Sequence, residues 1–129
     1  MLFRSYLEIG GEGNEELFTD FAPSLTVMTT ILNNYFPKRL TTDAGQKALT
    51  LNKPDPIVIG EKGFSYSAGS DEFGTIQYET ASKQYQAGDK LELIVPHCDP
   101  AVNEYDQIYA TRKDRVEAVW PISARGHSQ

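Results

Sequence analysis

The sequence predicts an all-β domain, built as a small β-barrel or a curled sheet. Several short stretches alternate apolar with polar residues and are rich in β-branched side chains, which is the pattern of strands with one wet face. Turn signals rich in Gly, Pro, Asn and Asp separate these stretches, and almost no stretch has helical periodicity. The chain of 129 residues has the length of one domain and can bury a single core.

The composition excludes several classes of protein. The net charge is −6 and the Lys and Arg residues are scattered, whereas a nucleic-acid binder needs a basic stripe. No apolar run approaches the ~20 residues of a membrane span, and no signal-peptide pattern opens the chain. The single cysteine, Cys98, excludes an internal disulfide framework and fits a reducing compartment. We therefore expect a cytoplasmic protein that binds neither nucleic acid nor a membrane.

The first third of the chain is expected to contain a lead-in and then strands. Residues 1–13 have little periodicity and are interpreted as a lead-in or an assembly scar, and Leu17–Phe18 would open a short strand. Ser24–Leu32 alternates Ser or Thr with apolar residues, which predicts a longer strand. Pro37 ends that segment, and Arg39–Thr42 is expected to be the return strand.

The middle of the chain is expected to combine one helical turn with two strands. Gln46–Leu49 could form a helical turn capped by Asp43, although a simple turn also fits these residues. Short strands are predicted at Pro56–Gly60 and Thr75–Glu79.

The last third is expected to contain one strand followed by a hairpin. Leu91–Val95 is apolar and β-branched enough for a strand. Asp106–Thr111 and Val116–Ile122 would then pair across a turn at Arg112–Arg115. Residues 127–129 form a polar tail.

The sharpest chemical signal is the pair His97 and Asp99, which follows the strand predicted at Leu91–Val95. Residues two apart in a strand project from the same face, so the imidazole and the carboxylate should point the same way, with Cys98 on the opposite side. Such a pair at a strand end makes half of a divalent-metal site with open positions for water or substrate. The two ligands suit Mn, Zn or Mg. The same spacing also occurs in exposed turns that bind nothing.

Three motifs occur in the same order as in a known family. They are Pro96-His97-Cys98-Asp99-Pro100 with Asn103, the earlier Thr42-Asp43-Ala44-Gly45-Gln46-Lys47-Ala48-Leu49, and Trp120-Pro121-Ile122-Ser123-Ala124-Arg125-Gly126. Together they resemble the C-terminal β domain of the D-threonine aldolase and D-serine dehydratase family, metal-activated pyridoxal phosphate enzymes of the alanine racemase-like type. The similarity covers residues 14–126, which we take as the domain.

The resemblance implies a larger enzyme. Family members carry pyridoxal phosphate on a lysine of an N-terminal (β/α)8 barrel, and the sequence has no eight strand–helix repeats, so the chain looks like a fragment or an isolated domain. His97 and Asp99 are implied as ligands of a metal that holds the substrate's β-hydroxyl, while pyridoxal phosphate takes up the electrons released when Cα–Cβ breaks. Asp43 and Lys47 match the family's Asp-Ala-Gly-x-Lys segment and are candidate catalytic residues.

The implied activity is that of a lyase domain acting on D-β-hydroxy amino acids, which are cleaved to glycine and an aldehyde. Dehydratase-like members carry Cys where Asp99 stands, so Asp99 favours the aldolase, and a D-serine dehydratase domain is the enzymatic alternative. A non-catalytic β-barrel interaction module is the other alternative, favoured by Phe73, which replaces a His of the family. The implied partners are the substrate and the barrel domain of the same or a second subunit in a homodimer. We therefore expect an exposed apolar or aromatic docking surface.

Overall fold

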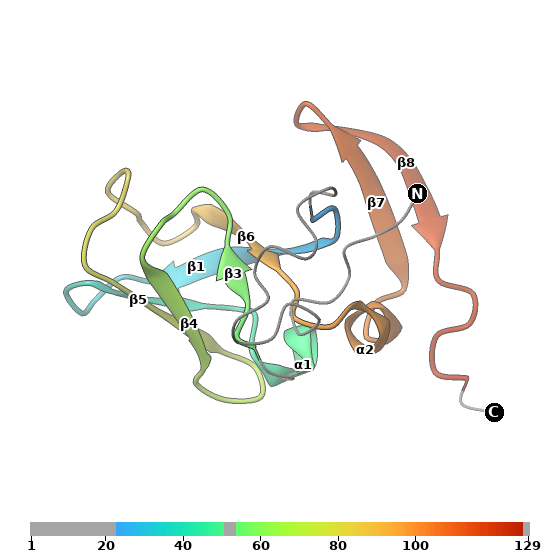
Figure 1. The fold of residues 1–129 in the computed structure, drawn as a ribbon, viewed down its shortest axis with the longest axis horizontal. Coiled ribbons are helices and arrows are strands. Elements are labelled where there is room, and N and C mark those ends of the chain that lie inside the picture. The colour runs from blue at the N-terminus through green and yellow to red at the C-terminus, as the bar shows by residue number, and fades with distance from the viewer. Residues whose placement is uncertain (1–22, 51–53, 128–129) are drawn as a thin grey trace, which may run out of the picture.

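The computed structural model describes residues 23–50 and 54–127, which form eight strands and two short helices (Figure 1). In chain order the elements are β1 (Thr26–Asn33), β2 (Arg39–Thr42), α1 (Gln46–Leu49), β3 (Ile57–Val58), β4 (Phe64–Ala68), β5 (Gly74–Tyr78), β6 (Lys90–Ile94), α2 (Cys98–Asn103), β7 (Gln107–Arg112) and β8 (Arg115–Pro121). The expected strand at Leu17–Phe18 and the lead-in at residues 1–13 lie outside the described residues. Within the described part of the chain, no helix is long and apolar enough to cross a membrane.

Six strands form one curled antiparallel sheet in the order β3-β6-β1-β2-β5-β4. The long strand β1 makes the curl possible, because its first part pairs with β6 from Thr26 to Thr30 and its end pairs with β2, with a register shift between Ile31 and Asn33. The two edge strands β3 and β4 lie against each other, so the sheet nearly closes on itself. The predicted all-β, barrel-like fold is confirmed.

The core fills the inside of this curled sheet. Four side chains from four different strands have no exposed surface, namely Ile31, Leu40, Ile76 and Leu93. Each contributes about 1.5–3 kcal/mol through burial of its apolar surface. On β1 the inward positions are Val27, Thr29 and Ile31, while Met28 points outward with 64% of its surface exposed.

Strands β7 and β8 form a separate two-stranded hairpin that stands away from the six-stranded sheet (Figure 1). Its turn consists of Lys113 and Asp114, both with positive φ (49° and 61°). A two-residue turn with positive φ at both positions has the twist of the flanking strands, which explains why the hairpin turns at Lys113 and Asp114. The predicted hairpin is confirmed, with strand bounds that differ from the prediction by one residue at each end.

Strand β4 has no counterpart among the predicted elements. Its sequence, Phe64-Ser65-Tyr66-Ser67-Ala68, alternates larger apolar residues with serines, and Tyr66 is buried on the core side. It pairs along its whole length with β5, from Phe64 opposite Tyr78 to Ala68 opposite Gly74. The period-two signal was therefore present in the sequence, and β4 completes the sheet edge that approaches β3.

Candidate functional site

His97 and Asp99 come together at the junction between β6 and α2. Strand β6 ends at Ile94, and His97 is the extended residue that precedes α2 (φ −140°, ψ 119°). Asp99 lies in the first turn of this helix, and its Oδ2 is 3.7 Å from His97 Nε2. The expectation that a continuous strand aligns the two side chains is wrong, because the chain turns into a helix at Cys98. The helix start brings them together instead, and Cys98 is buried.

The spacing of this pair fits a divalent cation. Two ligand atoms at about 2.1 Å from one ion and 3.7 Å apart subtend roughly 120° at the metal, which is close to a tetrahedral arrangement. The side chain of His97 is 26% exposed and that of Asp99 is 73% exposed, so the pair faces solvent on one side. Among the described residues, no group of three or more His, Cys, Asp and Glu side chains could hold a metal. The described protein groups would therefore leave coordination positions open.

A shallow pocket of about 200 Å³ lies between α1, the β4–β5 turn and the end of α2. Its lining residues are Asp43, Gly45, Lys47, Ala48, Asp71, Glu72, Glu104 and Tyr105. Asp43 and Lys47, the two predicted catalytic residues, therefore both line the pocket. Four carboxylates line it, whereas Lys47 is the one cationic side chain among its lining residues. Lys47 forms an ion pair with Glu72, and the hydrogen bond and charge of Glu72 raise the pKa of this ammonium group.

Asp43 anchors two strands to each other. Its Oδ1 accepts hydrogen bonds from Thr29 Oγ1 and from the Thr30 backbone N–H, each at 2.7 Å. Burial raises the pKa of this carboxyl, but the hydrogen bonds from Thr29 and Thr30 lower it more, so that the net pKa lies below its ordinary value of 3.8. The predicted capping of α1 by Asp43 is wrong, since Gly45 is the N-cap residue and has no side chain to make a cap bond.

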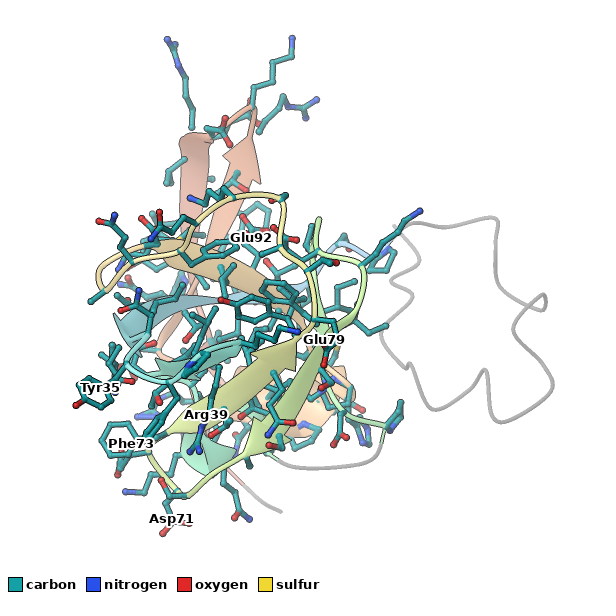
Figure 2. All side chains as sticks on the ribbon, turned by 90° about the vertical axis from the view of Figure 1, so that its left-hand side faces the viewer. Tyr35, Arg39, Asp71, Phe73, Glu79 and Glu92 are labelled. Carbon is teal, nitrogen blue, oxygen red and sulfur yellow. The ribbon has the colours of Figure 1, made fainter. Side chains whose placement is uncertain are left out.

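The start of α1 is bound to the β4–β5 turn through its backbone. The N–H groups of Gln46 and Lys47 donate to the carbonyl oxygens of Ser70 (3.1 Å) and Asp71 (3.0 Å). Gly45 allows this approach, because a Cβ at this position would lie 2.4 Å from the Phe73 nitrogen. Phe73 is 48% exposed, and its ring points outward near Asp71 in Figure 2. Phe73 therefore belongs to the loop whose residues Asp71 and Glu72 line the pocket.

Two tyrosines hold the segment that carries Asp43 and Lys47. The Tyr66 hydroxyl donates to the Ala44 carbonyl oxygen at 2.6 Å, and the Tyr105 hydroxyl donates to that of Ala48 at 2.9 Å. Burial raises the pKa of Tyr66 to about 12, so it remains a donor. Neither role was predictable from the sequence, because nothing local in the sequence pairs a tyrosine with a carbonyl 22 or 57 residues away.

The pair His97 and Asp99 and the pocket lie at opposite ends of α2. Asp99 lies in its first turn, whereas Glu104 and Tyr105, which follow its last residue, line the pocket. A six-residue helix is roughly 9 Å long at 1.5 Å per residue. The structure thus groups Asp43 with Lys47 and His97 with Asp99, and it separates the two groups by the length of this helix.

Comparison with known proteins shows the family to which the chain belongs. The family described as "Putative serine dehydratase domain" matches residues 24–111. The chain is 37% identical over 109 residues to D-threonine aldolase from Arthrobacter sp, covering 84% of this chain and 29% of that protein. It is 36% identical over 103 residues to 3-hydroxy-D-aspartate aldolase from Paracoccus denitrificans, covering 80% of this chain and 26% of that protein.

Solved structures show the same fold. The crystal structure of D-threonine aldolase from Filomicrobium marinum matches with a TM-score of 0.77 and 28% identity, over 82% of this chain and 29% of that chain. A D-threo-3-hydroxyaspartate dehydratase matches with a TM-score of 0.65, 17% identity and coverage of 83% and 33%, which is a likeness of fold alone. Fold and sequence together define a β domain of the kind found in D-threonine aldolases. The chain belongs to the serine dehydratase domain family, and it spans 26–33% of the length of the relatives named above.

Proposed function

We propose that this chain is the metal-binding C-terminal domain of a pyridoxal phosphate-dependent lyase that resembles D-threonine aldolase. The proposed reaction cleaves D-β-hydroxy amino acids to glycine and an aldehyde. The observation that supports it best is the 3.7 Å approach of His97 Nε2 to Asp99 Oδ2 at the start of α2, in a chain related to two aldolases. The aldolase activities belong to the two relatives, and the proposed activity of this chain is inferred from its similarity to them.

His97 and Asp99 would hold Mn, Zn or Mg in this proposal. The cation would supply Lewis-acid polarisation of the substrate's β-hydroxyl, which lowers the cost of removing its proton. Pyridoxal phosphate, expected on a barrel domain, would supply the electron sink. With His97 and Asp99 as the two protein ligands, the cation would remain accessible to the substrate oxygen.

Asp43 and Lys47 remain candidates for a catalytic or substrate-positioning role. Both line the pocket, but each already has a partner: Thr29 and Thr30 for the carboxylate, and Glu72 for the ammonium. An ammonium group with a raised pKa stays protonated at neutral pH. Lys47 is therefore suited to bind an anionic group of the substrate rather than to remove a proton.

A D-serine dehydratase domain is the enzymatic alternative. Asp99 supports the aldolase, since a carboxylate is a harder ligand than the thiolate expected in dehydratase-like members. A non-catalytic interaction module is supported by Phe73, which cannot bind a metal or transfer a proton.

We further propose that the domain packs against a barrel domain of the same or a second subunit in a homodimer.

Metal binding by the 129-residue protein tests the proposal directly. We expect titration with Mn²⁺, followed by electron paramagnetic resonance of the free ion, to show one site. His97→Ala and Asp99→Ala should each weaken binding about tenfold or more. Cys98→Ala is the matched control, because its buried side chain lies between the two ligands in the sequence and should leave the Mn²⁺ affinity unchanged. Equal affinity in all three variants would exclude His97 and Asp99 as the site.

Activity is tested in a chimera in which this chain's residues 24–126 replace the matched part of the Arthrobacter D-threonine aldolase. We expect aldehyde release from D-threonine with added Mn²⁺. His97→Ala and Asp99→Ala should abolish it while the absorbance of bound pyridoxal phosphate is retained. Asp99→Cys should favour Zn and shift the products from aldehyde towards ammonia. Full activity of both alanine variants would contradict the proposal.

A further inference from the structure

The six-stranded sheet has a seam, which is the line along which its edge strands β3 and β4 face each other. These two strands stand at opposite ends of the strand order and lie against each other without a ladder between them. Strand β3 is two residues long, and within the described part of the chain its ladder is with β6. Segments with few backbone bonds open locally at the lowest free-energy cost. The seam is therefore the part of the sheet that gains most from a further tie.

Glu61, in the turn between β3 and β4, supplies such a tie. Its carboxylate accepts hydrogen bonds from the Ser82 backbone N–H at 3.1 Å, from the Ser82 hydroxyl, and from the Tyr85 hydroxyl at 2.6 Å. Both donors lie on the connection between β5 and β6, 21 and 24 residues further along the chain. One side chain thus bonds the β3–β4 turn to a loop that is distant in the sequence.

The β5–β6 connection is itself fixed to β1 and to the turn that follows β1. The Gly88 N–H donates to the Ile31 carbonyl oxygen at 2.7 Å, and the Ile31 N–H donates to the Asp89 carbonyl oxygen at 2.8 Å. The side-chain amide of Asn34 donates to the Tyr85 carbonyl oxygen at 2.9 Å, and Tyr85 is buried. The connection is therefore a firm support, and Glu61 joins the β3–β4 turn to it.

The bonds to Glu61 require an ionised carboxylate. An ionised carboxylate only accepts hydrogen bonds, whereas a protonated carboxyl group also presents an O–H donor. The Ser82 N–H can only donate, and it faces both carboxylate oxygens, at 3.2 and 3.1 Å, so a proton on either oxygen sets a donor against a donor. Burial and the bond to Glu61 raise the pKa of Tyr85 to about 12, so its hydroxyl remains a donor.

Two other charged side chains face this cluster. Lys83 Nζ lies 3.4 Å from Asp89 Oδ2 and 4.9 Å from the centroid of the Tyr85 ring. The hydrogen bonds from Ser82 and Tyr85 lower the pKa of Glu61, and the positive charge of Lys83 lowers it further. Asp89 accepts a hydrogen bond from the Gln86 N–H at 3.2 Å within the same loop. A test of Glu61 must therefore separate its protonation from that of Asp89.

We infer that Glu61 is an ionisable latch that holds the seam closed, and that its protonation releases the β3–β4 turn from the β5–β6 connection. The latch lies away from the candidate site. The β1–β2, β3–β4 and β5–β6 connections gather at one end of the curled sheet, whereas α1, the β4–β5 turn and α2 lie at the other (Figure 1). The inference is independent of the proposed function.

Hydrogen exchange at pH 7 is the first test. The Ile59 N–H, which donates to the Glu92 carbonyl oxygen at 2.9 Å, reports on opening beside β3. Glu61→Ala should accelerate its exchange about five- to tenfold and leave the ladder amides of β2 unchanged. Glu79→Ala, which removes the exposed carboxylate of the Lys38–Glu79 ion pair, is the matched control and should not affect Ile59. Unaltered exchange of Ile59 in Glu61→Ala, or equal acceleration across the whole sheet, would overturn the inference.

The pH dependence of the same exchange is the second test, and it uses Glu61→Gln, which keeps the size and one acceptor oxygen of the side chain. The rate at Ile59 is divided by that of the β2 amides, which removes the intrinsic effect of pH. Because the folded pKa of Glu61 lies below its ordinary value of 4.5, the latch is intact above that value and is lost as the pH falls through the folded pKa.

In the wild type we therefore expect a constant ratio from pH 7 to about 5 and a severalfold rise below about 4.5. The rise should be absent in Glu61→Gln and should persist in Asp89→Asn. A rise that persists in Glu61→Gln, or one that disappears in Asp89→Asn, would overturn the assignment of the latch to Glu61.

Discussion

Replacing Asp43 tests whether this carboxylate is a structural anchor or a catalytic group. Asp43→Ala removes the acceptor of two hydrogen bonds and leaves the hydroxyl of Thr29, which is only 1% exposed, without its partner. An unpaired buried hydroxyl costs about 1–3 kcal/mol, and a hydrogen bond to a charged group contributes about 1.5–3 kcal/mol. The carboxylate itself is exposed, so solvent screens its charge and the lower ends of these ranges apply. We expect a loss of about 2–3 kcal/mol.

Asp43→Asn separates the two roles, because an amide oxygen can still accept the bonds from Thr29 and Thr30. We expect it to cost about 1 kcal/mol, the part that depends on charge. Urea unfolding at pH 7 followed by circular dichroism measures both values. Asp71→Ala, on the same pocket wall, is the control and should change stability by less than about 0.5 kcal/mol. An Asp43→Ala protein as stable as the wild type would refute the anchor.

The same anchor predicts a pH dependence. The folded pKa of Asp43 lies below its ordinary value of 3.8, so its ionised form stabilises the fold. That stabilisation is complete above the unfolded pKa and is lost as the pH falls through the folded pKa. The difference in unfolding free energy between wild type and Asp43→Asn should therefore be constant from pH 7 to about 5 and shrink below about 4. In the chimera, an Asp43→Asn variant that is stable but inactive would identify a catalytic role.

Three further changes follow from the local geometry. Tyr66→Phe leaves the Ala44 carbonyl without its buried donor and should cost about 1–3 kcal/mol in urea unfolding. Gly45→Ala places a methyl group 2.4 Å from the Phe73 nitrogen and should cost about 1–3 kcal/mol or prevent folding, which thermal denaturation would show. Asp114→Gly relieves a side chain held at φ 61° and should slow hydrogen exchange of the β7–β8 hairpin severalfold without changing that of β6.

The elements that depend on neighbouring residues were predictable from the sequence. The hairpin over β7 and β8, the return strand β2 and the single turn of α1 all form close to where turn residues and alternation placed them. Strand β6 was also placed within one residue at each end. In these segments the local preference and the tertiary structure agree, so short-range signals suffice.

Long-range contacts decided what the sequence could not show. On β1, alternation alone does not tell whether Met28 or Thr29 faces the core, because a shift of one residue exchanges the two faces. Thr29 faces inward, where its hydroxyl meets the carboxylate of Asp43, 14 residues further along the chain. The approach of His97 to Asp99 was expected from the alternation of side chains along a strand, whereas in the structure a helix begins at Cys98.

Helix α2 connects three features that could otherwise be treated separately. Asp99 in its first turn belongs to the proposed metal pair, Asn103 at its last position accepts a hydrogen bond from Gly126, which follows the β7–β8 hairpin, and the Tyr105 hydroxyl beyond it donates to the Ala48 carbonyl oxygen of α1. Because one six-residue helix carries the first two of these features and Tyr105 lies two residues beyond its end, a substitution that displaces α2 should disturb all three together.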